Sequence, residues 1–337
     1  MITVTLYYSD NCDICDQAET NLGELQDVAP HQLIKINIDQ DPALKNVFKD
    51  QVPVVEVGPY ILRSPFTKQD LQVSIKAATQ RMDHMTNLDD EKFQKRLKRG
   101  HTLNGTDRFS YWISNHYMLV FNCLVFLYVG LPFLAPILLK INVPGPAKVI
   151  YTIYSPLCHQ LAFRSWFLFG QQAYYPRNLA DISGVMTYEQ LTGQTQLDLI
   201  AARQFVGNTV VGYKVAICQR DVAIYASILL FGLIFTITGK KLRSFPWYVW
   251  VIVGLLPIAV DGISQLPDLL MIGSLPSWVP IRESTPFLRS LTGGLFGFTT
   301  AWYLYPLIEE TMLETRRTIL RKMATVEQSK PIPSVQS

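Results

Sequence analysis

Residues 2–15 are ITVTLYYSDNCDIC, and this stretch decides the fold of the N-terminal part of the chain. Residues 2–8 are rich in β-branched and aromatic side chains and predict a strand. A turn-forming Ser-Asp-Asn follows, and residues 16–27 predict a helix. Cys12 and Cys15 therefore stand where a strand passes into a helix.

The spacing of these two cysteines favours redox chemistry. It places both sulfurs on one side of the turn, within disulfide reach, and it places Cys12 at a helix N-terminus, where partial positive charge favours the thiolate. The acidic neighbours Asp10, Asp13 and Asp16 oppose thiolate formation. Three other interpretations stay open: half of a zinc site, two unrelated buried thiols, or a fold without activity. The adjacent sequence offers no second C-x-x-C or Cys/His pair, and the surrounding strand–helix pattern favours the redox interpretation.

Five further elements are predicted before residue 80. Pro42 suits the first position of a helix, and Gly58-Pro59 marks a turn between two strands. The predicted order is strand–helix–strand–helix–strand–strand–helix, with the later elements at residues 33–38, 41–48, 52–57, 60–62 and 68–78.

Residues 2–80 resemble a glutaredoxin-like domain of thioredoxin fold. The resemblance rests on Leu6-Tyr7-Tyr8-Ser9 running into the cysteine pair, on Ile36-Asn37-Ile38-Asp39, and on Val52-Pro53-Val54, where that family carries a cis-proline facing the cysteines. It implies that Cys12 is the nucleophile, Cys15 the resolving thiol and Pro53 a backbone clamp for the substrate. The chain departs from the family in the Asp-Ile dipeptide between its cysteines and in lacking the Gly-Gly that helps to hold glutathione.

The composition of the whole chain limits the class of protein to which it can belong. Of the 337 residues, 49% are hydrophobic and 17% charged, which excludes disorder for most of the chain. The net charge of +3 argues against a nucleic-acid binder driven by bulk charge. Five cysteines are too few for a disulfide framework, and the first residues lack the pattern of a signal peptide. We therefore expect the head, residues 1–80, to stay in the cytoplasm.

Residues 111–310 hold long uncharged stretches that predict a membrane domain. It follows a charged linker at residues 81–110, in which residues 89–99 predict an exposed helix that is either a solvated connector or a basic stretch touching anionic lipid. Four stretches are long and apolar enough to span a bilayer, at residues 117–139, 222–239, 245–260 and 291–308. Residues 147–170 form a fifth candidate that carries polar residues in its middle.

Basic clusters decide between these topologies. Clusters at residues 92–99, 240–243 and 316–322 all fall on the cytoplasmic side if the chain has four spans. The predicted fold is therefore an α/β thioredoxin-like domain plus an all-α polytopic membrane bundle, with four spans and residues 147–170 as a re-entrant or interfacial helix. Both termini are expected in the cytoplasm of a bacterium, beneath its inner membrane. Residues 171–213 are expected to form a polar outer insertion and residues 311–337 a cytoplasmic tail whose end, from residue 327, is disordered.

Polar residues that a bilayer should reject gather near the outer face in this topology, and ionisable groups at such depth indicate a functional site. A purely structural ion-pair network is the competing interpretation. The residues concerned are Cys158, His159, Gln160, Arg164 and Ser165; Cys218, Arg220 and Asp221; Asp261 and Gln265; and Arg282, Glu283, Ser284, Arg289 and Thr292.

Three chemistries fit this cluster. Thiolate, imidazole and carboxylate are the ligands that zinc or another transition metal prefers, and they are supplied here by Cys158, His159, Cys218 and Asp261. Cys158 and Cys218 can instead form a disulfide across the outer loop. The arginines can hold an anionic headgroup or substrate.

Residues 147–308 also resemble an uncharacterised bacterial family of multi-pass membrane proteins. The resemblance rests on the motifs around Cys158, Cys218, Asp261 and Arg289, which occur in the same order, and it implies no activity. The sequence thus predicts a membrane-tethered thiol–disulfide oxidoreductase that meets the bilayer and a thiol or disulfide partner, and no nucleic acid. The alternative is a metal-binding membrane enzyme or transporter whose head is a redox sensor or docking module.

Overall fold

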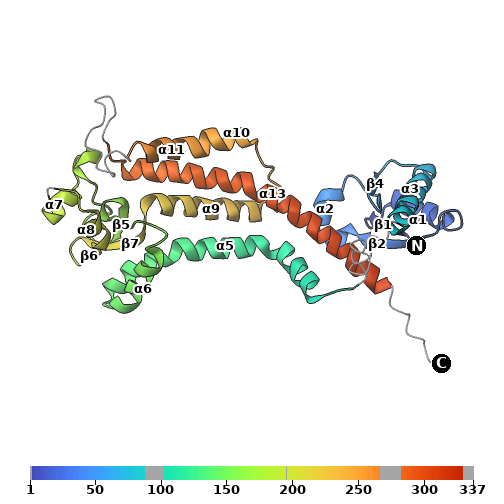
Figure 1. The fold of residues 1–337 in the computed structure, drawn as a ribbon, viewed down its shortest axis with the longest axis horizontal. Coiled ribbons are helices and arrows are strands. Elements are labelled where there is room, and N and C mark those ends of the chain that lie inside the picture. Colours follow the sequence, from blue (N-terminus) through green and yellow to red (C-terminus); the bar gives the residue numbers. More distant parts are fainter. Residues whose placement is uncertain (1, 88–101, 195, 266–281, 329–337) are drawn as a thin grey trace. The chain divides into compact units, whose positions relative to one another are not determined.

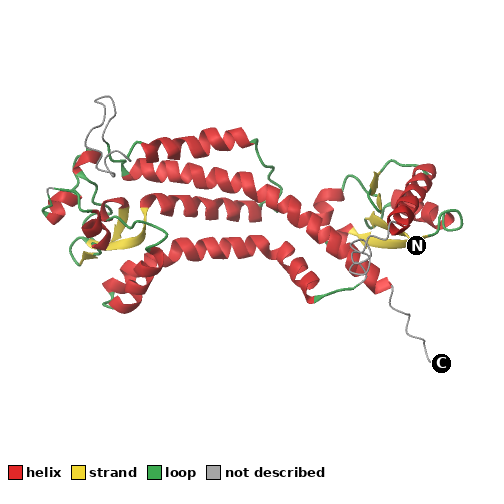
Figure 2. Cartoon of the chain, viewed as in Figure 1, coloured by secondary structure: helices red, strands yellow, loops and turns green. Residues whose placement is uncertain are grey.

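The computed structural model describes residues 2–87, 102–194, 196–265 and 282–328, and it divides into two compact units. Unit one comprises Met1–His116 together with Glu310–Ser337, and unit two comprises Tyr117–Glu309. Figure 1 labels the elements, and Figure 2 shows the strands, which form two sheets. The helix predicted at residues 89–99 and the end of the tail, residues 329–337, lie outside the described residues.

Unit one begins with the predicted alternation of strands and helices. Its four-stranded sheet has the order β2-β1-β3-β4, in which β1 pairs parallel with β2 and antiparallel with β3. The parallel pair needs a crossover, which α1 supplies. The elements are β1 (Ile2–Tyr8), α1 (Asp13–Glu24), β2 (His31–Asn37), α2 (Pro42–Phe48), β3 (Val54–Val57), β4 (Tyr60–Arg63) and α3 (Lys68–Asn87), so the predicted order is confirmed.

Alternation along the strands fills both faces of this sheet. Val4 and Leu6 pack with residues of α1 and α3, whereas Tyr7 points to the opposite face and stacks on Phe48 of α2, with ring centroids 5.1 Å apart. The second face also receives Leu320 from α13 (Pro286–Gln328). The predicted tail therefore continues as helix to Gln328 and completes the core of the head, because an amphipathic helix buries its apolar stripe where a sheet face is uncovered.

Unit two contains a bundle of long helices. α5 (Gly105–Lys140) and α9 (Gln219–Ile237) are each long and apolar enough to cross a membrane. The third predicted span corresponds to an apolar helix over Trp247–Ile263, assigned as α10 (Trp247–Val249), a π-helical segment (Trp250–Leu255) and α11 (Leu256–Ile263). The fourth lies within α13, so each predicted span is helical, while the number that cross a bilayer stays a prediction.

Between α5 and α9 the chain forms a small folded lobe, which we define as residues 144–218. After α6 (Pro144–Tyr154) the chain leaves the helix and forms β5 (Ser165–Leu168). β5 pairs antiparallel with β7 (Gly212–Cys218), which also pairs with β6 (Gly207–Asn208). The predictions of an all-α second domain and of a helix through 147–170 are therefore wrong. The run of β-branched and aromatic residues within 212–218 carried a strand signal, and hydrogen bonding to β5 satisfies its backbone.

The predicted insertion at residues 171–213 belongs to this lobe and has its own core. Buried Phe163 and Phe167 pack against Tyr175 and Tyr188, and the short helices α7 (Tyr188–Thr192) and α8 (Leu199–Gln204) cover them. Tyr175 Oη donates a hydrogen bond to the carbonyl of Val211 at 3.0 Å. The segment is thus an ordered subdomain that positions β7 rather than a loop.

Glycines allow α9 and α13 to approach closely. Gly293 and Gly297 of α13 are four residues apart, and a Cβ on Gly297 would meet the backbone of Ile224 well inside van der Waals contact. Such small-residue pairs are typical of helix contacts in membranes. Gly294 faces more open space, because a Cβ added there would lie 3.8 Å from Ser227 Oγ, its nearest neighbour.

We expect Gly297→Ala to destabilise unit two by about 1–3 kcal/mol, because the added methyl group must push the helices apart. Gly294→Ala is the matched control and should be neutral or slightly stabilising, since alanine favours helix. Thermal unfolding of the full chain in detergent measures both. Equal stabilities of the two variants would contradict the close approach.

Candidate functional site

Cys12 and Cys15 form a disulfide at the start of α1, with their Cα atoms 5.2 Å apart. Cys12 is the N-cap of this helix, and its sulfur accepts a hydrogen bond from the backbone N–H of Cys15 at 3.2 Å. Cys12 is partly exposed, whereas Cys15 is 2% exposed. An incoming sulfur can therefore reach Cys12 but not Cys15.

The turn that carries Cys12 is fixed by residues at the end of β2 and in the 3-10 turn directly after it. The Asp39 carboxylate accepts hydrogen bonds from Ser9 Oγ at 2.6 Å and from the backbone N–H of Asp10 at 2.8 Å. Asn37 Nδ2 donates to the carboxylate of Asp10 at 2.8 Å. Hydrogen bonds from Lys45, Ser9 and Asp10 hold the pKa of Asp39 well below its usual range. Asp39 is thus a positioning residue, which the sequence analysis named only as part of the motif Ile36-Asn37-Ile38-Asp39.

Pro53 lies at the same edge of the sheet. The Val52–Pro53 peptide bond is cis, as the resemblance implies, and Val54 directly after it pairs with Tyr7 near the end of β1. The carbonyl of Pro53 accepts a hydrogen bond from the backbone N–H of Ser64 at 3.2 Å. The end of β1 leads into the Cys12 turn, so the register places Pro53 beside the segment that carries the disulfide.

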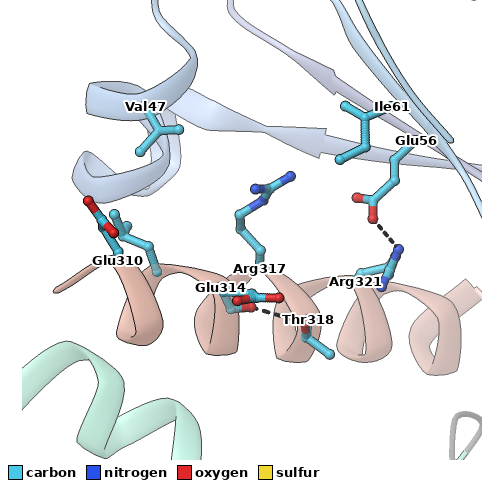
Figure 3. A pocket seen from close by; sticks show the side chains of 9 residues that line it. Val47, Glu56, Ile61, Glu310, Glu314, Arg317, Thr318 and Arg321 are labelled. Carbon is cyan, nitrogen blue, oxygen red and sulfur yellow. Dashed lines mark hydrogen bonds and ion pairs between the residues drawn. The ribbon is translucent and has the colours of Figure 1, made fainter. Parts of the chain in front are cut away.

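A separate pocket of about 440 Å³ lies in unit one where the head meets the last part of α13 (Figure 3). Neither cysteine of the disulfide lines it. Arg321 bonds to the Glu56 carboxylate at 2.6 Å, and the guanidinium of Arg317 lies over the ring of Phe48 at 4.7 Å. Tyr7 Oη donates to Glu56 at 3.1 Å, and burial is the main cause that raises the pKa of Tyr7 to about 12. These contacts attach α13 to the sheet face opposite α1.

We expect Arg321→Glu to speed backbone hydrogen exchange in residues 310–328 by about fivefold. The Arg321 side chain of the ion pair with Glu56 is one-third exposed. Loss of this pair therefore costs at most about 1 kcal/mol of the free energy that holds α13 in place. Adding Glu56→Arg should restore protection by recreating the pair in reverse. Lys68→Glu, which breaks the exposed pair with Glu24, is the control and should leave α13 unchanged. Unrestored exchange in the double variant would contradict the pairing.

The polar residues predicted to cluster in unit two divide into two groups. The first is centred on Glu283, which is nearly inaccessible to solvent. Both its oxygens accept from Arg164 at 2.8 Å, and Arg289 also pairs with it. Arg289 further donates to Gln265 Oε1 at 3.2 Å. The start of α13 is thereby joined to the lobe and to the end of α11.

Asp261 is the second centre of this network. Its carboxylate pairs with Arg220 at the start of α9 and with Arg282, the latter at 2.9 Å. Ser284 Oγ donates to it at 3.0 Å, and Gln265 Nε2 donates to its backbone carbonyl. We define Arg164, Arg220, Asp261, Gln265, Arg282, Glu283, Ser284 and Arg289 as the ion network. These contacts pair every ionic side chain of the network, and the choice between a functional site and a purely structural network stays a prediction.

The second group is Cys158, Cys218 and Asp221, whose ligand atoms all lie within 4.8 Å of one another. A hydrogen bond between the two thiols raises the pKa of Cys158, together with burial, and lowers that of Cys218. His159 is exposed and Asp261 belongs to the ion network, so the group differs from the predicted metal set. The choice among metal, disulfide and anion stays a prediction.

Lys214 was missed by sequence reasoning. Its side chain is fully buried in β7, and its Nζ donates to the carbonyls of Gln160 and Arg203, both at 2.7 Å. Burial lowers the pKa of Lys214 to about 7. The available signal was a single lysine within the apolar run of β7. Gln160 is also buried, and its side chain donates to the carbonyl of Tyr151 at 2.9 Å.

Comparison with known proteins finds one matching family in the head and another in unit two. Residues 3–76 match the family described as a glutaredoxin-like domain (DUF836), and residues 203–303 match the family described as a predicted membrane protein (DUF2085). The second match includes Cys218, Asp221 and Asp261 but not the segment around Cys158. An uncharacterised protein of Methanocaldococcus jannaschii is 29% identical over 165 residues, which is 48% of this chain and 69% of that protein. The chain is therefore a fusion of a glutaredoxin-like domain with a DUF2085 domain.

Proposed function

We propose that the chain is a membrane-tethered thiol–disulfide oxidoreductase that works through Cys12 and Cys15. The observation that carries the proposal is the unequal exposure of the two cysteine residues. Cys12 is partly exposed at the N-terminus of α1, and Cys15 is buried one turn behind it. This is the arrangement expected of an attacking thiol and a resolving thiol.

The reaction proceeds in two exchanges when the protein reduces its substrate. The Cys12 thiolate attacks one sulfur of the substrate disulfide, and the other substrate sulfur leaves as a thiolate. The Cys15 thiolate then attacks Cys12 Sγ in the mixed disulfide and releases the second substrate thiol. Two electrons pass to the substrate and the Cys12–Cys15 disulfide forms. A separate thiol donor must reduce this disulfide before the next cycle.

The surroundings of Cys12 serve this chemistry. The N–H of Cys15 and the start of α1 stabilise negative charge on Cys12 Sγ. Asp39 fixes the preceding turn, so the sulfur keeps its place between successive exchanges. The backbone beside cis-Pro53 is the proposed clamp for the substrate chain, because it lies at the same sheet edge and its strand partner leads into the turn.

The helices of unit two supply the proposed tether. α5 and α9 meet the length and polarity of a membrane span, and the basic residues near their expected cytoplasmic ends include Lys240 and Lys241. We therefore place the head in the cytoplasm with both termini, and the lobe on the other side of the membrane. The partners are then a bilayer and a cytoplasmic thiol or disulfide.

The experiment is disulfide exchange by the full chain in detergent micelles. A fluorescent peptide disulfide serves as substrate, and glutathione or a dithiol serves as donor in parallel reactions. We expect turnover with the dithiol. The parallel reaction with glutathione tests whether the chain can use this donor without the Gly-Gly that helps to hold glutathione in the glutaredoxin-like family. A rate equal to that of the Cys12→Ser variant would contradict the proposal.

A further inference from the structure

The group of Cys158, Cys218 and Asp221 joins two segments that are sixty residues apart in sequence. Cys158 follows α6, Cys218 ends β7 and is the N-cap of α9, and Asp221 lies in the first turn of that helix. Cys158 is 7% exposed, and the other two side chains are partly buried. We propose that these three residues bind one thiolate-preferring divalent transition metal ion, of which zinc is the first to test.

The donor set matches such an ion. Two thiolates and a carboxylate are ligands of zinc, whereas magnesium and calcium prefer oxygen donors alone. In a tetrahedral zinc site the ligand atoms are about 3.3–3.8 Å apart, given metal–ligand lengths of about 2.0–2.3 Å. The observed limit of 4.8 Å lies about 1 Å above this range. Binding an ion therefore requires the most distant of these ligand atoms to approach one another by about 1 Å.

Backbone donors already face the two sulfurs. The N–H of Cys218 donates to Cys158 Sγ at 3.3 Å, and the N–H of Asp221 donates to Cys218 Sγ at 3.5 Å. Hydrogen bonds of this kind stabilise thiolate, which is the form that binds metal. Cys218 also lies at the positive end of α9, a helix of 19 residues.

The segment that carries Cys158 is held in place by the lobe. Lys214 donates to the carbonyl of Gln160 at 2.7 Å, and the N–H of Cys158 donates to the carbonyl of Tyr154 at 3.0 Å. In the sheet, Ser165 pairs with Cys218 itself. The ligands are therefore positioned before an ion binds, which lowers the ordering cost of binding.

Three protein ligands leave a fourth position for water or another small ligand. Zinc sites of this composition differ from closed structural sites, which have four protein ligands. With zinc, two thiolates and one carboxylate, the bound group would carry a charge of −1. The site is independent of the proposed redox role of the head.

The test uses the full chain in detergent with both Cys12 and Cys15 replaced by serine, so that the head contributes no thiols. We expect one zinc per chain by elemental analysis after zinc loading and desalting. Cobalt loading should give thiolate-to-cobalt absorption. Cys158→Ser and Cys218→Ser should each lower the zinc content at least fivefold, and Asp221→Asn should lower zinc affinity tenfold or more. Cys123→Ser and His159→Ala are the controls and should retain the metal.

A second measurement needs no ligand variant. Zinc should protect Cys158 and Cys218 from alkylation in the otherwise wild-type bundle, and a chelator should remove this protection. The proposal is overturned if the loaded chain carries no metal, if His159→Ala alone releases it, or if peptide mapping finds a Cys158–Cys218 disulfide under reducing purification. Loss of metal with an unchanged elution volume on gel filtration distinguishes lost ligands from misfolding.

Discussion

Replacing Cys12 with serine is expected to slow disulfide exchange by a factor on the order of 10³ or more, because a serine hydroxyl stays protonated and cannot attack a disulfide. Cys12 is the partly exposed residue of the pair, so we do not expect Cys15 to take over the first exchange from its buried position. The measurement is the initial rate with a fluorescent peptide disulfide and a dithiol donor.

Cys15→Ser should behave differently. Its Cys12 can still attack the substrate, but the mixed disulfide has no resolving thiol, so a covalent adduct should accumulate and be visible by intact mass. Cys123→Ser is the matched control, because Cys123 is a free cysteine in α5. A mixed disulfide between Cys15 and the substrate in the Cys12→Ser variant would show that Cys15, rather than Cys12, is the attacking thiol. None of these outcomes bears on zinc content, so the two proposals can fail separately.

Asp261→Ala is expected to lower the free energy of unfolding of unit two by about 3 kcal/mol. Asp261 is 3% exposed, and its removal leaves Arg220 and Arg282 without this partner carboxylate and takes from Ser284 the shorter of its two hydrogen bonds. Breaking a buried ion pair from one side typically costs about 3–5 kcal/mol, and the partial exposure of Arg282 favours the lower end. Denaturant unfolding in mixed micelles measures the change.

Asp181→Asn is the control for this variant. Asp181 is exposed and has a positive φ of 47°, which asparagine tolerates, so its replacement should change stability by less than about 0.5 kcal/mol. A comparably small effect of Asp261→Ala would show that the ion network does not stabilise the unit and would favour a binding role for its arginines.

The head was predictable from sequence because its signals are local. The strand at residues 2–8, the turn after it and the cysteine spacing each occupy a few consecutive residues, and the later strands are marked by β-branched residues and Gly-Pro. Neither the role of Asp39 nor the packing of Leu320 was predictable in this way. Both depend on contacts with residues far away in the chain.

The lobe is a second case in which local sequence did not predict the structure. The uncharged character of most of residues 147–170 favoured a helix, and only pairing with β7 turns Ser165–Leu168 into a strand. Apolar composition alone does not distinguish a buried strand from a buried helix. Sequence also treated the polar residues as one cluster, whereas side-chain geometry divides them between the ion network and the group of Cys158, Cys218 and Asp221.

From the sequence alone we could infer which parts the protein has. These are an α/β head that carries two cysteines, a set of apolar helices, and polar residues whose burial among those helices costs free energy. Tertiary structure decided which of those residues meet. It placed Cys15 behind Cys12, attached the C-terminal helix to the head, and brought Cys158 next to Cys218 and Asp221. The reason is physical. Helix and strand periodicity reflect neighbouring residues, while burial and charge pairing depend on segments far apart in sequence that only the tertiary fold brings together.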